Sequence, residues 1–176
     1  MRKLKITELN RMSVEEFKEA DKLPLVVILD DIRSLHNIGS VFRTADAFRV
    51  ECIYLCGITA RPPHSEMHKT ALGAEYTVDW QYYNKTVEAV DKLKTEGYTV
   101  FAIEQVENSL KLEELSLDKK KKYAIVMGNE VKGVQQEVVD HCDNCIEIPQ
   151  YGTKHSLNVS VTAGIVIWDF FKLLSF

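Results

Sequence analysis

Short apolar runs recur along the chain, separated by polar stretches that contain glycine, proline and charged residues. The run from Leu25 to Leu29 follows Pro24 and has no polar position, which is the pattern of a strand buried on both faces. Five further runs of similar length are rich in β-branched, aromatic or cysteine side chains and also predict strands. The six predicted strands cover residues 25–29, 52–56, 76–80, 99–103, 123–127 and 145–148.

Between these runs, apolar residues recur every three or four positions, as they do on one face of a helix. Ser13 followed by Glu16 forms a capping-box pattern and predicts a short helix that ends near Ala20. Four further helices are predicted at 37–48, 84–96, 134–141 and 157–174, and 59–72, with Pro62 and Pro63, predicts a loop with a short helical turn. Because strands alternate with helices, the predicted fold is α/β, with a mostly parallel sheet and helices on both faces.

The last predicted helix is apolar nearly all the way round, and its large side chains include Ile165, Trp168 and Phe171. One face of a sheet cannot cover all of them, so the helix needs a second apolar partner. Either one monomer buries the helix completely, or a second copy of the chain packs against it. We favour the homodimer.

The chain length of 176 residues suits a single domain with a substantial core. We expect a short helical extension at 1–24 and one main domain at 25–176. Met1–Lys5 is basic but lacks the apolar run of a signal peptide, and the longest apolar run, 164–168, is too short to cross a bilayer. These features favour a cytoplasmic protein without a membrane partner.

The charge argues mildly against nucleic-acid binding, because a net charge of −4 leaves little excess of the Lys and Arg that contact phosphates. A local basic patch remains compatible with this balance. The run Lys119–Lys122 is interpreted as a solvated loop before a strand.

The four cysteines form two pairs, Cys52/Cys56 and Cys142/Cys145, with His141 beside the second pair. Zinc sites use such pairs, but here the pairs lie far apart in sequence and overlap apolar strand patterns. We therefore favour buried reduced thiols and expect no metal site.

Three polar segments carry the candidate chemistry. No G-x-G-x-x-G motif follows any predicted strand, so a nucleotide-like ligand would have to be held by other loops. The first segment, Asn37–Ala45, places Asn37 and Ser40 near a helix start, where anions and ribose groups can bind, and Arg43 nearly two turns after Asn37, as a guanidinium suited to phosphate. The second, Gly128–Val134, has two glycines around Glu130 directly after a strand. The third, Ile148–Val161, leads into the last helix through Ser156 and Asn158.

Taken one at a time, each segment has a simpler explanation. Asn37 could be an ordinary helix cap and Arg43 could pair with a surface acid. Ser156 or Asn158 could likewise cap the last helix, and the Gly128–Gly133 stretch could be a plain strand-to-helix turn. The three segments in this order are much more specific than any one of them.

Together the segments resemble the SpoU (TrmH-like) branch of the SPOUT RNA 2′-O-ribose methyltransferases. The resemblance covers about 25–171 and rests on Asn37, Gly39, Arg43 and Ala45, on Lys69–Ala74, on Gly128, Glu130 and Gly133, and on Pro149, Gly152 and Ser156–Ser160. Arg49 departs from the family pattern, in which many relatives have glycine after the helix. The resemblance implies a catalytic domain at 25–176 with a deep C-terminal trefoil knot and an active site at a homodimer interface.

The family comparison also implies which residues act. S-adenosylmethionine would be the cofactor, held mainly by backbone at Ile103, Glu104, Met127, Gly128, Asn129, Ile148, Ser156 and Leu157. The catalytic group would be Asn37, Arg43, Glu130, Ser156 and Asn158, acting on a ribose 2′-oxygen of tRNA or rRNA. The family's favoured mechanism makes the arginine a general base. Because a guanidinium does not readily release its proton, we interpret Arg43 as an electrostatic organiser, with phosphate or water taking the proton.

Two other functions remain open at this point. One is an RNA-binding protein of the same fold that has lost transferase activity, although the polar set is complete. The other is a zinc or thiol-redox protein. The absence of a separate RNA-binding domain favours tRNA over rRNA as substrate, with contacts from Arg33, Arg61, His64, Lys69 and Lys154, each of which is equally consistent with ordinary surface charge.

Overall fold

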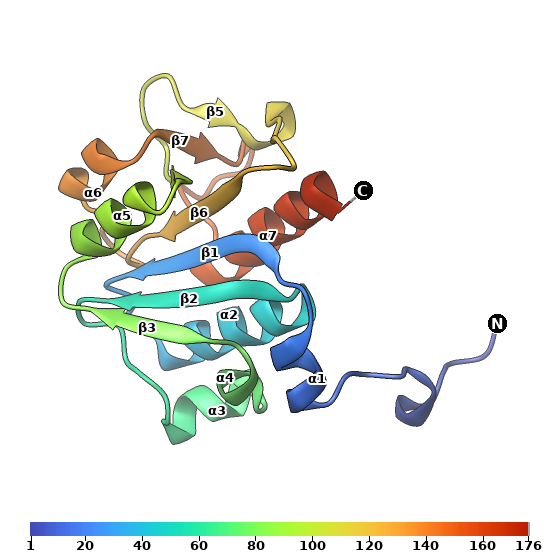
Figure 1. Cartoon of the computed structure of the whole chain (residues 1–176). Helices are drawn as coiled ribbons and strands as arrows, with labels where there is room; N and C mark the ends of the chain where they lie inside the picture. Colours follow the sequence, from blue (N-terminus) through green and yellow to red (C-terminus); the bar gives the residue numbers. More distant parts are fainter. Residues whose placement is uncertain (176) are drawn as a thin grey trace.

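The chain folds around one seven-stranded parallel sheet, seen in a computed structural model that describes residues 1–175 apart from the side chain of Ile6. Phe176, the end of the predicted main domain, lies outside the described residues. The strand order is β3-β2-β1-β6-β4-β7-β5, and every paired strand is parallel to its neighbour (Figure 1). The strands are β1 Leu23–Asp30, β2 Val50–Cys56, β3 Trp80–Tyr83, β4 Tyr98–Ile103, β5 Leu110–Lys111, β6 Lys122–Met127 and β7 Asn144–Glu147.

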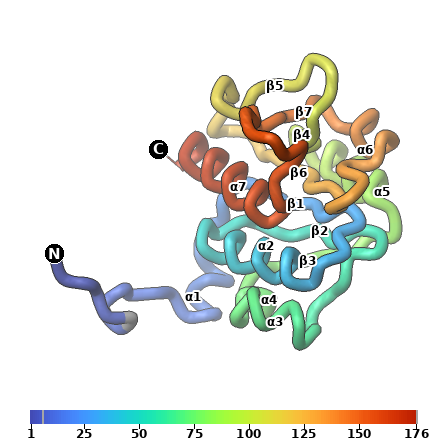
Figure 2. Tube along the Cα trace, turned by 180° about the vertical axis from the view of Figure 1, so that it is seen from behind, coloured from blue at the N-terminus to red at the C-terminus, as the bar shows by residue number. Residues whose placement is uncertain are grey.

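Helices cover both faces of the sheet, which confirms the predicted fold class. They are α1 Val14–Glu19, α2 Leu35–Ala47, α3 Ser65–Ala71, α4 Ala74–Thr77, α5 Thr86–Thr95, α6 Gln136–His141 and α7 Val159–Ser175, with 3₁₀ turns η1 Ile6–Glu8 and η2 Leu112–Glu114. Seen from behind, α2 and α7 are nearest the viewer and run side by side (Figure 2).

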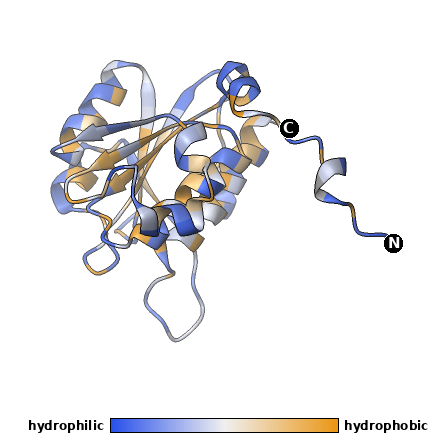
Figure 3. Cartoon of the chain, turned by 90° about the horizontal axis from the view of Figure 1, so that it is seen from below, coloured by the Kyte–Doolittle hydropathy of each residue, from blue (hydrophilic) through white to orange (hydrophobic). Residues whose placement is uncertain are grey.

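Side chains of the buried strands point alternately to the two faces of the sheet and contribute to two separate hydrophobic cores. In β1, Leu25, Val27 and Leu29 pack under α2 and α7, while Val26 and Ile28 point the other way, under α5 and α6. Successive side chains of a strand point to opposite faces, so a wholly apolar run serves both layers. Figure 3 shows this interior as hydrophobic, with the N-terminal segment projecting away from the body.

Most predicted elements are confirmed, and the capping box is present: Ser13 Oγ accepts from the Glu16 N–H while the Glu16 carboxylate accepts from the Ser13 N–H. The predicted strand 76–80 is wrong. Leu72 and Gly73 both have positive φ, 53° and 99°, and turn the chain into the short helix α4. The Glu75 carboxylate accepts from the Gly73 N–H and stabilises that turn, so β3 begins only at Trp80.

Two other predictions need correction. Helix α2 begins at Leu35, because Ser34 and not Asn37 caps it through the Asn37 N–H. The two-residue strand β5 has no counterpart among the predicted strands, since it is too short to give a sequence pattern. For the last helix, the two alternatives were complete burial within one monomer and packing against a second copy. Val161, Ile165 and Trp168 are 51%, 38% and 50% exposed, so the described chain does not bury α7 completely.

Candidate functional site

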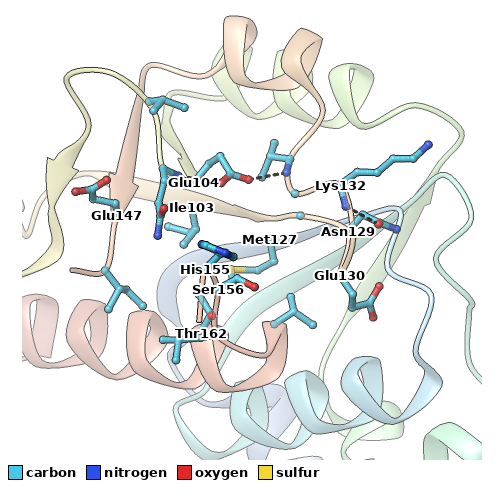
Figure 4. A pocket seen from close by; sticks show the side chains of 18 of the residues that line it. Ile103, Glu104, Met127, Asn129, Glu130, Lys132, Glu147, His155, Ser156 and Thr162 are labelled. Atoms are coloured by element: carbon cyan, nitrogen blue, oxygen red, sulfur yellow. Dashed lines mark hydrogen bonds between the residues drawn. The ribbon is translucent and has the colours of Figure 1, made fainter. Parts of the chain in front are cut away.

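A tight loop after β6 forms one wall of the site. A Cβ on Gly128 would lie 2.2 Å from the Val134 nitrogen, so only glycine allows the two ends of the loop to approach this closely. Asn129 and Gly133 exchange backbone hydrogen bonds of 3.0 and 2.9 Å, and Asn129 Oδ1 accepts from the N–H groups of Val131 and Lys132. The Glu104 carboxylate at the end of β4 accepts from the Val134 N–H at 2.9 Å (Figure 4). The loop is therefore held to the neighbouring strand.

Glu130 connects this loop to the start of α2. Its carboxylate accepts from the backbone N–H groups of Arg33 and Ser34 and from Asn37 Nδ2, each at 3.0 Å. Desolvation raises the pKa of Glu130, but these hydrogen bonds outweigh it and hold the pKa below its ordinary value of 4.5. Glu130 is therefore ionised at neutral pH and stabilises the helix start.

Asn158 extends the same network to the third segment. Its Nδ2 donates to Asn37 Oδ1 at 3.2 Å, while its Oδ1 accepts from the Ser160 N–H at the start of α7. A hydrogen-bonded series, Glu130–Asn37–Asn158, thus joins the three segments. Asn37 lies 93 positions from Glu130 and 121 positions from Asn158 in the sequence. Asn158 is both a helix cap and a member of the site, so the two interpretations of this residue do not compete.

Asp30 is a buried carboxylate near this network that sequence reasoning missed. Asp30, at the end of β1, is fully buried and accepts from Thr86 Oγ1 at 2.5 Å and from the Gln135 backbone and side chain at 3.1 and 2.7 Å. It joins the end of β1 to the start of α5 and to the residue that precedes α6. The available signal was an acid directly after a wholly apolar strand, which needs partners wherever it is buried.

These elements enclose a pocket of about 650 Å³ at the carboxyl ends of β4, β6 and β7. All eight residues predicted to hold the cofactor line it: Ile103, Glu104, Met127, Gly128, Asn129, Ile148, Ser156 and Leu157. Of the predicted catalytic residues, Glu130, Ser156 and Asn158 line the pocket, and Asn37 is hydrogen-bonded at its rim. Lys132, His155 and Thr162 also line it and were not predicted (Figure 4).

Arg43 is placed apart from the other predicted catalytic residues. It is exposed on α2, does not line the pocket, and has no polar partner within the described part of the chain. Asn37 and Arg43 are six residues apart on the helix, which separates them by about 9 Å along the axis and turns them to different faces.

The residues predicted to contact RNA are all exposed, although the side chains of Arg61, His64 and Lys69 have partners on the protein. The Arg61 guanidinium lies 4.4 Å from the centre of the Tyr82 ring, and Lys69 pairs with Glu66. Arg33, His64 and Lys154 complete this set.

The cysteines lie within the fold's layers. Cys52, Cys56 and Cys145 are buried, as predicted, whereas Cys142 is only partly buried. Within residues 1–175 no group of three or more His, Cys, Asp or Glu side chains is arranged to hold a metal ion. None of the helices formed by these residues is both long and apolar enough to span a bilayer.

The fold and site define a parallel α/β protein with a pocket formed by loops at the carboxyl edge of its sheet. The sequence pattern of the SpoU rRNA Methylase family matches residues 24–168, and this chain belongs to that family.

Known relatives agree with this assignment. A putative TrmH family tRNA/rRNA methyltransferase of Staphylococcus haemolyticus is 31% identical over 159 residues, which are 90% of this chain and 63% of the relative. The tRNA (guanosine(18)-2'-O)-methyltransferase of Aquifex aeolicus is 32% identical over 162 residues, covering 89% of this chain and 72% of that enzyme. A crystal structure of an AdoMet-bound rRNA methyltransferase from Sinorhizobium meliloti has a TM-score of 0.77 and 26% identity, covering 88% and 61% of the two chains. The chain thus spans less than two thirds of the staphylococcal relative's length.

Proposed function

We propose that this protein transfers a methyl group from S-adenosylmethionine to a ribose 2′-oxygen of RNA in the cytoplasm, with tRNA favoured over rRNA. The observation that carries the proposal is the convergence of three separate family motifs on one pocket, joined through Glu130, Asn37 and Asn158. The names of the relatives support the same reaction and include both kinds of RNA.

The pocket fits the proposed cofactor in size and chemistry. Its volume of about 650 Å³ lies within the range of sites for drug-sized ligands. Met127, Ile148 and Leu157 offer apolar surface for a purine ring. The carboxylates of Glu104 and Glu130 suit a ligand that carries positive charge, while Glu147 is paired with Lys111. When bound, S-adenosylmethionine supplies a methyl group already activated by a sulfonium.

The protein's own residues would then position the ribose and manage its proton. Asn37, Ser156 and Asn158 present neutral donors and acceptors at the pocket rim, which suit ribose hydroxyls. Arg43 would hold the neighbouring phosphate and stabilise negative charge as it develops on the 2′-oxygen. The proton would leave to that phosphate or to water, since a guanidinium is a poor base.

Arg43 would perform this role in the pocket of a second copy. It is exposed and lies outside its own chain's pocket. Helices α2 and α7 run alongside each other. Asn37 contacts Asn158 near their starts, and Phe48 at the end of α2 contacts Trp168 and Phe171 in the second half of α7. An apolar α7 face next to the helix that carries Arg43 supports a homodimer whose interface includes this arginine.

The trefoil knot belongs to the same proposal. In the sheet, β7 is separated from β1 by β4 and β6. Helix α7, which follows β7 in the chain, nevertheless packs on α2 and β1. The chain after β7 therefore crosses back over the carboxyl edge of the sheet. That return path supports the expected knot.

The decisive test is transfer of labelled methyl from S-adenosylmethionine to RNA from a strain that lacks this gene, with tRNA and rRNA separated. We expect label in the tRNA fraction with the wild-type protein and none with Arg43→Ala. If the protein binds the cofactor and RNA but labels neither fraction, the non-catalytic RNA-binding role replaces the enzyme. Failure to bind the cofactor at all contradicts the methyltransferase proposal.

A further inference from the structure

A second, smaller hollow lies outside the proposed methyl-transfer site, at the start of α3 and beside α4. It has a volume of about 300 Å³ and is lined by Pro63, His64, Ser65, His68 and Tyr76. All five residues are exposed, so the hollow is open to solvent. In Figure 1, α3 and α4 lie together beyond the β3 edge of the sheet, next to α2. Nothing in the proposed methyl transfer uses these residues.

The wall of this hollow is supported by a buried acid. The side chain of Glu75 is only 1% exposed, and its carboxylate contacts His68 Nδ1 at 2.5 Å and accepts from the Gly73 N–H at 2.9 Å. Burying a carboxylate is costly unless such partners compensate it. The side chain of His68 is itself 55% exposed, so Glu75 fixes the orientation of a ring that faces solvent.

The exposed rings and ring nitrogens form a surface that combines aromatic faces with a hydrogen-bond donor and an acceptor. The His68 and Tyr76 rings lie 6.2 Å apart at 46°, and Tyr76 is 59% exposed. His64 Nδ1 accepts from the Glu66 N–H, so a neutral His64 carries its proton on Nε2 and can donate from there. His68 donates to Glu75 from Nδ1, which leaves its Nε2 as an acceptor when the ring is neutral. Aromatic faces beside a donor and an acceptor match the faces and edges of a nucleobase.

The hollow is fixed relative to the proposed ribose site. A Cβ on Gly39 of α2 would lie 2.2 Å from Thr70 Oγ1 and 2.3 Å from the Met67 carbonyl oxygen, so α2 and α3 leave no room for a side chain between them at this position. Thr70 Oγ1 also donates to the His36 carbonyl oxygen at 2.9 Å, one residue before Asn37. Because α2 carries Asn37 at the pocket rim, the hollow and the pocket keep a constant relative position.

The surrounding charges tolerate an RNA strand. Arg61 is exposed two residues before Pro63, and Lys69 is exposed on α3. The nearby Glu66 carboxylate is compensated by Lys69 and His36, and Glu75 is covered by His68. Phosphates that approach this surface therefore meet the Arg61 guanidinium, while Lys69 is paired with Glu66.

We propose that the His64–His68–Tyr76 hollow binds an unstacked base of the substrate RNA that flanks the methylated nucleotide. This inference rests on the proposed function, because it assigns a second contact to the same RNA. Stacking on Tyr76 and His68 supplies affinity, and the two histidine nitrogens read the base edge.

The test compares Tyr76→Ala with Tyr76→Phe, which keeps the ring. Dissociation constants are measured by filter binding for the tRNA and rRNA fractions of a strain lacking this gene, and for S-adenosylmethionine by calorimetry. Loss of a stacked base weakens binding by roughly 5- to 150-fold, so we expect Tyr76→Ala to weaken tRNA binding by about 10-fold. Tyr76→Phe should stay within twofold of wild type, and cofactor binding should not change.

The outcomes separate this inference from the proposed function. If Tyr76→Ala binds RNA within twofold of wild type while methyl transfer proceeds, the base-binding hollow is wrong and the enzyme assignment stands. If Tyr76→Phe is weakened as much as Tyr76→Ala, the hydroxyl and not the ring makes the contact, and stacking is wrong. Wild-type protein that binds neither RNA fraction overturns both proposals. Because Tyr76 is largely exposed, an unchanged unfolding midpoint is the check that both variants are folded.

Discussion

Glu130 accepts three hydrogen bonds from the loop that starts α2 and thereby joins two of the family's motifs. Its pKa is held below the ordinary value of 4.5, so the fold favours the ionised carboxylate. The resulting stabilisation is fully present above about pH 4.5 and is lost as the pH falls through the folded-state pKa.

We predict that Glu130→Gln lowers the free energy of unfolding by about 1 kcal/mol at pH 7, because charged acceptors are replaced by a neutral amide. Urea unfolding of both proteins at pH 7 and pH 3.5 measures the effect. The difference between wild type and variant should shrink at the lower pH. A difference that stays constant with pH would show that the carboxylate's charge does not stabilise the loop.

Arg43 offers a second test at the residue scale. A lysine keeps the charge but loses the planar fork that can grip a phosphate with two hydrogen bonds. We predict that Arg43→Lys lowers the single-turnover rate of methyl transfer by about 100-fold or more. The thermal midpoint should not change, since Arg43 is exposed and lacks a polar partner among residues 1–175. Near-full activity of this variant would show that the planar guanidinium is not needed.

The reactivity of the cysteine thiols distinguishes a structural role from a redox role. Burial raises the pKa of Cys52, Cys56 and Cys142 to about 12, with nearby acids adding to the effect. At pH 8 about one thiol in 10⁴ is then ionised, and the thiolate is the reactive form. We predict that Ellman's reagent labels these cysteines in the native protein at least 100-fold more slowly than in urea. Fast native labelling of the Cys142/Cys145 pair would revive the thiol-redox alternative.

At the scale of elements, the close packing of α2 on α3 depends on a single glycine. A Cβ on Gly39 would lie 2.3 Å from a backbone oxygen, the Met67 carbonyl. Because a backbone atom cannot rotate away, one of the two helices would have to move. We predict that Gly39→Ala destabilises the protein by about 1–3 kcal/mol, as overpacking usually does. Gly152→Ala is the matched control, because a Cβ there meets nothing within 4 Å and its φ is not positive. Equal unfolding midpoints for the two variants would contradict this packing argument.

Local patterns predicted most of these elements, and their failures have local physical causes. The alternation and apolar runs of β1, β2, β4, β6 and β7 were sufficient, because each strand is buried on one or both faces. The error at 76–80 came from Leu72, whose left-handed conformation no propensity of leucine predicts. Arg49 gives the reverse case: it departs from the family's glycine yet has a φ of 51°, so it occupies a turn that suits glycine.

At the scale of the whole molecule, the sequence motifs identified the pocket residues but not how they are joined. Asn37 and Asn158 were each predicted as site residues, but their hydrogen bond spans 121 positions and follows from the sheet order. Asp30 was missed for the same reason, since its partners Thr86 and Gln135 lie at the start of α5 and directly before α6. For Arg43 the sequence motif implies a catalytic role, but Arg43 does not line the pocket of its own chain.

The exposed face of α7 carries the last prediction, because the proposed function places Arg43 in the pocket of a second copy. Val161, Ile165 and Trp168 lie on this face, and Trp168 also contacts Phe48 and Phe171. We predict that Ile165→Glu raises the dimer dissociation constant by at least about 100-fold, since a buried unpaired carboxylate costs several kcal/mol. Light scattering after gel filtration would measure it, with Ile58→Glu, on an exposed loop residue, as the control.

Methyl transfer should fall with dimerisation in Ile165→Glu, while binding of S-adenosylmethionine falls less, because the residues predicted to hold the cofactor belong to one chain's pocket. Mixing Arg43→Ala with a variant that has an intact Arg43 but a defective pocket, such as Gly128→Ala, then tests the arrangement directly. If Arg43 acts on the partner's pocket, the mixed dimer contains one complete site and recovers part of the activity that neither variant has alone. No recovery in a demonstrated mixed dimer would place Arg43 at its own chain's pocket and require α2 to move towards it.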